Sequence, residues 1–182
     1  MNSPATLANV DAYETVERTN FDRLVNFFNT TGNKVIEYYV EPKNNYSSND
    51  GWILFLMPDG TQQKAMVEVK TRTNYSFNQY EDTPLTQRKL SGLRKKCTDA
   101  KGEFKKVLHA QFFDDGLIVN DITWMIPDDA DITWRPIFVT PVHSDPNGVK
   151  RAEDKAWMDH PVGQSKGPRF IRVTAKRVDQ TN

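Results

Sequence analysis

Apolar side chains at helical spacing predict an amphipathic helix over residues 12–31. Four of them stand at i, i+3, i+4 and i+7 and share one face: Phe21, Leu24, Val25 and Phe28. Gly32, followed by Asn33, predicts the end of this helix, because glycine readily adopts the left-handed conformation that closes a helix. We therefore expect one helix that buries a single face near the start of the fold.

Three strands are predicted after this helix. Residues 34–40 (KVIEYYV) are β-branched and aromatic, and Pro42 ends them. Residues 52–57 (WILFLM) are continuously apolar, which is typical of a strand buried on both faces. Residues 64–72 (KAMVEVKTR) form the next strand. The sequence Pro-Asp-Gly at 58–60 lies between the last two strands and predicts a hairpin turn.

A second helix and further strands are expected in the rest of the chain. Thr83 as N-cap and Pro84 as first helical residue predict a helix that runs to about residue 101. Leu90, Leu93 and Cys97 share its apolar side. The remaining patterns predict a surface loop at 73–82, strands at 104–113, 116–124, 132–142 and 170–178, and a short helix at 151–158.

The order of these elements indicates an α/β fold in one domain. A length of 182 residues is close to the usual size of a single domain. We expect a mixed central sheet with the helix 12–31 on one side and the helix 84–101 on the other. Residues 12–125 would form the core of this domain, and residues 126–182 a β-rich C-terminal extension.

Charge is balanced over the whole chain, so net charge does not indicate a nucleic-acid partner. The 24 lysines and arginines equal the 24 aspartates and glutamates, and the sequence pI is about 6.8. Any attraction to phosphate must therefore come from local patches. Two basic clusters are candidates: Arg88, Arg94, Lys95 and Lys96 on the second helix, and Lys166, Arg169, Arg172, Lys176 and Arg177 near the C-terminus. Each cluster is also explained as an ordinary solvated face.

A single cysteine, Cys97, excludes an internal disulfide framework and lacks the spacing of a zinc site. Residues 1–10 have neither the basic segment nor the apolar run of a signal peptide. No window approaches the roughly 18 apolar residues of a membrane span. These features predict a cytoplasmic protein without a membrane partner.

The triplet Glu68-Val69-Lys70 carries the most informative chemistry in the chain. Two residues apart on a strand, Glu68 and Lys70 share one face, while Val69 points to the other. Phosphodiester hydrolysis needs carboxylates that hold a divalent cation, together with a cationic group near the attacking water. The triplet supplies one carboxylate and one ammonium for such a site.

The predicted hairpin brings a second carboxylate to the first. If the turn at 58–60 has its glycine in the left-handed conformation, Met57 pairs with Thr61. Counting outward along both strands then places Asp50 directly opposite Glu68, roughly 5 Å away between Cβ atoms. A loop one residue longer would instead place Asp50 opposite Val69. Asp59 also precedes the triplet, but it lies at the turn, roughly 30 Å along the ladder from Glu68.

This arrangement resembles the PD-(D/E)XK nuclease superfamily, which includes restriction endonucleases and Holliday junction resolvases. The likeness covers roughly residues 12–125 and rests on Asp50, the apolar strand after it and the run Glu68-x-Lys70. It implies a restriction-endonuclease-like αβββαβ core and a metal-dependent nuclease with DNA as expected substrate. Asp50 and Glu68 would bind Mg²⁺ or Mn²⁺, with the Val69 carbonyl as a third ligand, and Lys70 would assist the hydrolytic water.

The resemblance also implies contributions from the two helices. Members often add a glutamate from the first helix, and Glu17 matches best, with Glu14 and Asp22 as open alternatives. A glutamine or lysine on the second helix is common too, which indicates Gln87, with Lys89 as the other match. The chain departs from the family pattern in having Asn49 and Gly51 around the aspartate.

Two readings from other classes compete with a nuclease. One is a non-catalytic module of the same fold that binds DNA or a protein. The other is an accessory protein in which Glu68 and Lys70 form a surface ion pair worth under about 1 kcal/mol. Tyr75, Phe77 and Tyr80 could stack on bases or simply cover the core. Endonuclease or exonuclease action, DNA or RNA as substrate, and a homodimer all stay open at this level.

Overall fold

The computed structural model describes residues 4–42, 49–72, 82–114, 116–130, 132, 134–139 and 151–159. In chain order the elements are α1 (Pro4–Thr30), β1 (Lys34–Val40), β2 (Gly51–Leu56), β3 (Gln62–Arg72), β4 (Asp82–Thr86), α2 (Gln87–Asp99), β5 (Phe104–Phe113), β6 (Gly116–Asp121), the 3-10 turn η3 (Thr123–Met125), β7 (Trp134–Val139) and β8 (Arg151–Asp159). The predicted loop 73–82 and the predicted strand 170–178 fall largely or wholly outside the described residues, as do Tyr75, Phe77, Tyr80 and the C-terminal basic cluster.

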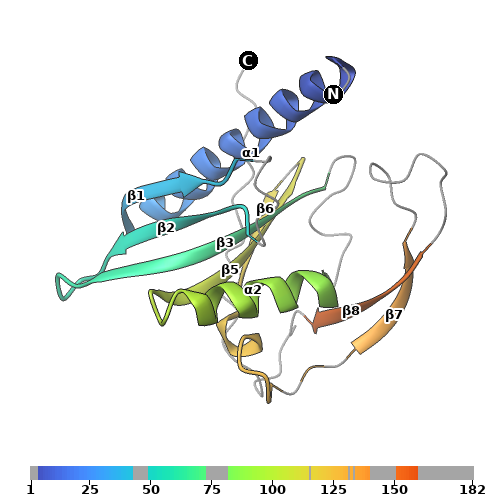
Figure 1. Cartoon of the computed structure of the whole chain (residues 1–182). Coiled ribbons are helices and arrows are strands. Elements are labelled where there is room, and N and C mark those ends of the chain that lie inside the picture. The colour runs from blue at the N-terminus through green and yellow to red at the C-terminus, as the bar shows by residue number, and fades with distance from the viewer. Residues whose placement is uncertain are drawn as a thin grey trace.

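A five-stranded mixed sheet forms the centre of the fold, in the order β1-β2-β3-β5-β6 (Figure 1). The pairs β1–β2, β2–β3 and β5–β6 are antiparallel, and β3–β5 is parallel. A parallel pair needs a long crossover connection, and α2 lies in the crossover between β3 and β5. A second sheet of three strands has the order β4-β8-β7. The predicted mixed α/β architecture is therefore confirmed.

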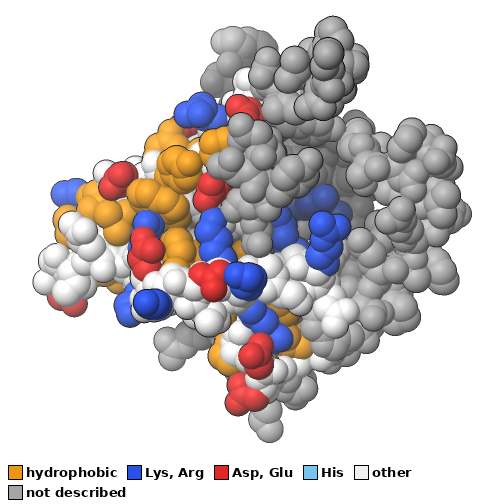
Figure 2. All heavy atoms as spheres, viewed as in Figure 1, with side chains coloured by type: hydrophobic (Ala, Val, Ile, Leu, Met, Phe, Trp, Pro, Cys, Tyr) orange, Lys and Arg blue, Asp and Glu red, His pale blue; other side chains and the backbone are white. Residues whose placement is uncertain are grey.

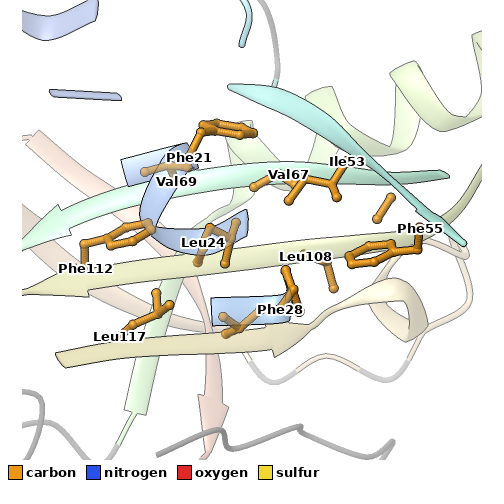
Figure 3. Close-up of a cluster of buried hydrophobic side chains, with 13 residues drawn as sticks. Phe21, Leu24, Phe28, Ile53, Phe55, Val67, Val69, Leu108, Phe112 and Leu117 are labelled. Carbon is orange, nitrogen blue, oxygen red and sulfur yellow. The ribbon is translucent and has the colours of Figure 1, made fainter. Parts of the chain in front are cut away.

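The two helices cover opposite faces of the five-stranded sheet, as the sequence predicts (Figure 1). On one face, Phe21, Leu24 and Phe28 of α1 pack into a core with alternate residues of the strands (Figure 3). On the other face, Leu90 and Leu93 of α2 pack in a smaller cluster with Met66, Val107, Ile122 and Met125. Alternation along β3 thus assigns Val67 and Val69 to the α1 face and Met66 to the α2 face.

The β2–β3 hairpin has the predicted turn. Gly60 adopts φ +83°, the Met57 N–H donates to the Thr61 carbonyl at 2.8 Å, and the Gly60 N–H donates to the Met57 carbonyl at 2.9 Å. The ladder continues from Leu56 opposite Gln62 to Gly51 opposite Val67. The predicted pairing of Met57 with Thr61 is confirmed.

The prediction that 52–57 is a strand buried on both faces was wrong. Ile53 and Phe55 are buried against α1, whereas Trp52, Leu54 and Leu56 are only partly buried. The reason is that α2 lies over β3 and β5, so the α2 face of β1 and β2 extends beyond it. Apolar side chains gather on the surface over this part of the sheet in Figure 2.

The starts of both helices differ from the sequence prediction. Helix α1 begins at Pro4 instead of residue 12. Residues 82–86 form β4 instead of the start of α2, because they pair with residues 155–159 of β8. Thr86, not Thr83, caps α2: its hydroxyl accepts a hydrogen bond from the Lys89 N–H at 3.2 Å.

The predicted short helix at 151–158 was also wrong, because this stretch is strand β8 between β4 and β7. The strand predicted at 116–124 ends at Asp121, where the side chain accepts hydrogen bonds from Thr123 and starts the turn η3. No helix in the described part of the chain is long and apolar enough to cross a membrane.

Candidate active site

Asp50 directly precedes β2, and Glu68 lies on β3 at the end of the hairpin ladder. The Asp50 N–H donates to the Val67 carbonyl at 3.0 Å, so Asp50 and Gly51 both lie against Val67 and the regular ladder ends there. The Val69 N–H donates to Oδ2 of Asp50 at 2.7 Å. The predicted strand pairing of Asp50 with Glu68 is therefore not part of the ladder, but the Asp50 side chain reaches that of Glu68 and shares a hydrogen bond with it.

Gly51 and Asn49 give Asp50 its place. A Cβ atom on Gly51 would lie 2.1 Å from the Tyr39 carbonyl oxygen and 2.7 Å from Cζ of Phe21, so only glycine lets β1 and α1 approach here. Asn49 is buried, and its Nδ2 donates to the Gly51 carbonyl at 2.6 Å. The two departures from the family pattern therefore have structural roles beside the aspartate.

Both acids are buried on the α2 face of the sheet, with Asp50 7% and Glu68 6% exposed. Burial raises the pKa of Glu68 well above its usual range, and the negative charge of Asp50 raises it further. The Lys89 ammonium acts in the opposite direction. Two buried carboxylates side by side thus favour the binding of a positive charge next to them.

Lys89 from α2 supplies one such cation. Its Nζ lies 2.8 Å from Oε2 of Glu68. Gln87, the first residue of α2, is exposed to solvent. Of the two matches that the family pattern offered on this helix, the structure brings Lys89 to the acid pair.

Lys70 follows Glu68 on the same face of β3 and is exposed to solvent. Neighbouring groups still remove part of the water around its ammonium. This partial desolvation, followed by the positive charge of Arg72, lowers the pKa of Lys70. Val69 lies between Glu68 and Lys70. Its side chain points into the α1 core, and its N–H donates a hydrogen bond to Asp50. The alternation that the sequence predicts for Glu68, Val69 and Lys70 is confirmed.

Helix α1 approaches β3 from the opposite face. Nδ2 of the buried Asn20 donates to Oγ1 of Thr71 at 2.9 Å, and Thr71 alternates with Lys70 along the strand. Glu17 lies three residues before Asn20 and is partly buried. Helix α1 itself packs on the face of the sheet opposite to Glu68. Of the two alternatives, Asp22 accepts a hydrogen bond from the Tyr38 hydroxyl, and Glu14 lines a shallow depression on α1 with Asp22.

Buried polar residues continue the site across the sheet. Glu68 is opposite His109 of β5, and His109 is opposite Asn120 of β6, so one level of the sheet carries all three. His109 is 2% exposed and its Nδ1 has no hydrogen-bond partner among the described residues. Burial, followed by the charge of Arg72, lowers its pKa to about 3, so the imidazole is neutral at pH 7. The alternation of polar and apolar residues around His109 is the sequence signal for this row.

Glu41 extends the same row in the other direction. Its N–H donates to the Asp50 carbonyl at 2.8 Å, and its Oε1 lies 2.7 Å from Nζ of Lys96. Lys96 follows Lys89 by two helical turns. Helix α2 therefore pairs Lys89 with Glu68 and Lys96 with Glu41, the two acids on either side of Asp50. Figure 2 shows the resulting mixture of acidic and basic side chains on the face that carries α2.

The donor set suits a hard divalent cation better than a softer metal. Asp50 and Glu68 offer carboxylate oxygens, the ligand type that Mg²⁺ and Mn²⁺ prefer. Within the described residues no group of three or more histidine, cysteine, aspartate or glutamate side chains is arranged to hold a metal. A cation here would complete its shell with water, a backbone carbonyl or phosphate oxygens.

Comparison with known proteins does not extend these observations: no protein-family model matches the chain, and no curated protein matches it significantly.

Proposed function

We propose that this chain is a metal-dependent nuclease of the PD-(D/E)XK kind that hydrolyses phosphodiester bonds, with DNA as the expected substrate. The proposal is supported by the buried pair Asp50–Glu68, whose side chains meet at the end of the β2–β3 ladder, and by Lys70, which follows Glu68 on the same strand. A surface ion pair would not need two nine-tenths-buried carboxylates in contact. Because like charges repel when desolvated, such a pair is costly unless a cation is bound.

The proposed roles follow from the positions of the groups. Asp50 and Glu68 would hold Mg²⁺ or Mn²⁺, and the Val69 carbonyl would be the third ligand. When bound, the cation lowers the pKa of a coordinated water and offsets charge that develops on the phosphate. Its charge also keeps Glu68 ionised in spite of the raised pKa of this carboxyl.

Lys70 is the proposed group at the attacking water. Its position next to Glu68 and its exposure to solvent leave the ammonium accessible to substrate. Its lowered pKa makes the neutral amine easier to reach, so Lys70 can orient the water or accept its proton. Glu17 and Gln87 stay proposals that rest on the family resemblance alone.

The substrate is proposed from local charge and from the resemblance. Lys70, Arg72 and Lys89 surround the acid pair and would face a phosphodiester backbone, although the net charge of the chain is zero. The choice of DNA over RNA follows the resemblance. A non-catalytic DNA- or protein-binding module with the same fold is the second candidate.

A digestion assay tests the proposal. We expect the wild-type chain to cleave linear, nicked or branched DNA in the presence of Mn²⁺, and we expect Asp50→Asn and Glu68→Gln to lower cleavage at least about a hundredfold. Asp59→Asn is the matched control, because Asp59 lies in the turn of the same hairpin and bonds to Thr61. An RNA substrate of the same sequence decides between the two nucleic acids.

Two outcomes would reject a nuclease. Equal cleavage by the wild type and by both site variants would indicate a contaminant. Absence of Mn²⁺ binding together with retained DNA affinity would instead support the non-catalytic module.

A further inference from the structure

Lys89 makes a contact with the acid pair that the proposed hydrolysis does not use. It is the residue of α2 whose ammonium reaches the buried acid pair, 2.8 Å from Oε2 of Glu68. The carboxyl side of this pair is 8% exposed and the lysine side chain 29% exposed. The contact is therefore largely removed from solvent. An ion pair in such a shielded place is much stronger than one at the surface.

Helix α2 fixes this lysine in place. The Lys89 N–H is bonded to the capping hydroxyl of Thr86, and the neighbouring Leu90 and Leu93 are buried in the core under the helix. The backbone of residue 89 thus has little freedom to withdraw. Only the flexible side chain can move the ammonium away from Glu68.

The other lysine pairs on this helix differ in their surroundings. Lys95 pairs with Asp99 at the surface, where both side chains are more than half exposed. Lys96 pairs with Glu41, which is partly buried but is not a member of the proposed cation-binding pair. Lys89 has its ion pair with a proposed metal ligand, Glu68.

We propose that Lys89 is an internal counter-ion of the acid pair that competes with the divalent cation for Glu68 and must move away when the cation binds. The inference rests on the proposed cation site. Its physical basis is that one carboxylate oxygen contacts the ammonium, and a dication at the same oxygen would stand within a few ångströms of a like charge. The structure thus assigns Lys89 to setting the cation affinity of the site.

This role predicts two effects of opposite sign. Removing the ammonium leaves two buried acids without compensation, so the protein should be less stable without a divalent cation. The same change removes a competitor, so the cation should bind more tightly. A lysine that merely braces α2 would lower stability without improving cation binding.

The test compares Mn²⁺ binding by calorimetry in the wild type, Lys89→Met and Lys89→Gln, with thermal unfolding measured with and without Mn²⁺. Methionine keeps the aliphatic stem of lysine, and glutamine keeps a hydrogen-bond donor without charge, so one of the two should fold if the other does not. Lys95→Met and Lys96→Met are the controls on the same helix. Lys96→Met measures the effect of removing a nearby charge that does not contact Glu68.

We expect both Lys89 variants to bind Mn²⁺ at least about fivefold more tightly, and both controls to stay within about twofold of the wild type. We also expect Mn²⁺ to raise the unfolding temperature more in the Lys89 variants than in the wild type. Equal or weaker binding by the Lys89 variants, with clear binding by the wild type, would overturn this inference and leave the nuclease proposal standing. Equal tightening in Lys96→Met would replace direct competition by a general charge effect. No binding in any variant would overturn both proposals.

Discussion

The carboxylate of Asp50 accepts a hydrogen bond from the Val69 N–H, so this residue supports the hairpin as well as the proposed cation site. In a regular ladder a backbone carbonyl would take this N–H, but here the ladder ends at Gly51 and Val67. The side chain of Asp50 replaces the missing backbone acceptor. Substitutions of Asp50 therefore separate into those that keep an acceptor and those that do not.

Asp50→Ala should be less stable than Asp50→Asn, because alanine leaves the buried Val69 N–H without a partner. The unsatisfied group costs on the order of 1–3 kcal/mol. Urea unfolding of the two variants in buffer without divalent cations measures the difference. Equal stability would show that water or another group satisfies the N–H.

The raised pKa of Glu68 should make the stability of the fold depend on pH. Its pKa in the folded chain lies well above the ordinary 4.5, because of burial and the charge of Asp50. Between these two values the folded state binds more protons than the unfolded state, so the free energy of unfolding falls as pH rises through this window. Glu68→Gln does not titrate and should lack this fall.

Urea unfolding of the wild type and Glu68→Gln from pH 4 to pH 8, without divalent cations, checks the expectation. The stability of the variant relative to the wild type should increase with pH by at most about 1.4 kcal/mol per pH unit. His109 acts in the opposite direction in both proteins, because its pKa is lowered from 6.5 to about 3. Taking the difference between the two proteins removes its effect. A difference that does not change with pH would mean that Glu68 has no raised pKa.

Spacing along one hairpin was sufficient to predict the turn, the ladder from Leu56 to Gly51 and the side of β3 on which Glu68 and Lys70 lie. These features depend on local geometry, namely the period of a strand and the type of the turn. The counted pairing of Asp50 with Glu68 is not in the ladder, because the Asp50 N–H bonds to the Val67 carbonyl instead. His109 and Asn120 could not be assigned from spacing, because their contact with the site depends on the registers of β5 and β6. Lys89 matched the family pattern no better than Gln87 until the start of α2 was known.

At the level of elements, two glycines hold the site hairpin in different ways. Gly60 supplies a positive φ in the turn, and a Cβ added to it would meet no atom within 4 Å. Gly51 has no positive φ but lies against the backbone of β1 and the ring of Phe21. One glycine is required for backbone conformation and the other for close packing.

Gly51→Ala should therefore be far more damaging than Gly60→Ala. A Cβ at 2.1 Å from the Tyr39 carbonyl forces β1 and β2 apart, and we expect a loss of at least about 3 kcal/mol or failure to fold. Gly60→Ala should cost roughly 1–2 kcal/mol through backbone strain alone. Chemical denaturation of both variants compares them, and similar losses would contradict the packing argument.

The boundaries of α2 show where local signals fail. Thr83-Pro84 and Thr86 both carry helix-start signals, and pairing of residues 82–86 with β8 decides between them. The same distant pairing makes a strand of 151–159, where charged residues had indicated a short helix. Strand β1 and the hairpin needed no such partner, and their predicted bounds agree with the structure within two residues.

For the whole molecule, the sequence predicts a mixed sheet between two helices, and the structure confirms it. The parallel pairing of β3 with β5 joins residues about 40 positions apart and brings polar side chains of β5 beside the acids. Strands β7 and β8 join β4 in a separate sheet, which no local pattern indicated. Because the net charge of the chain is zero, electrostatic attraction of a ligand must come from local groups such as the acid pair and the cations around it.

Direct Mn²⁺ titration tests whether Asp50 and Glu68 together bind a divalent cation. Electron paramagnetic resonance counts free Mn²⁺ as the chain is added, for the wild type and for the double variant Asp50→Asn, Glu68→Gln. We expect at least one bound ion per wild-type chain and its loss in the double variant, whose circular dichroism should stay unchanged. Equal Mn²⁺ binding by the two proteins, or none by the folded wild type, would contradict this expectation.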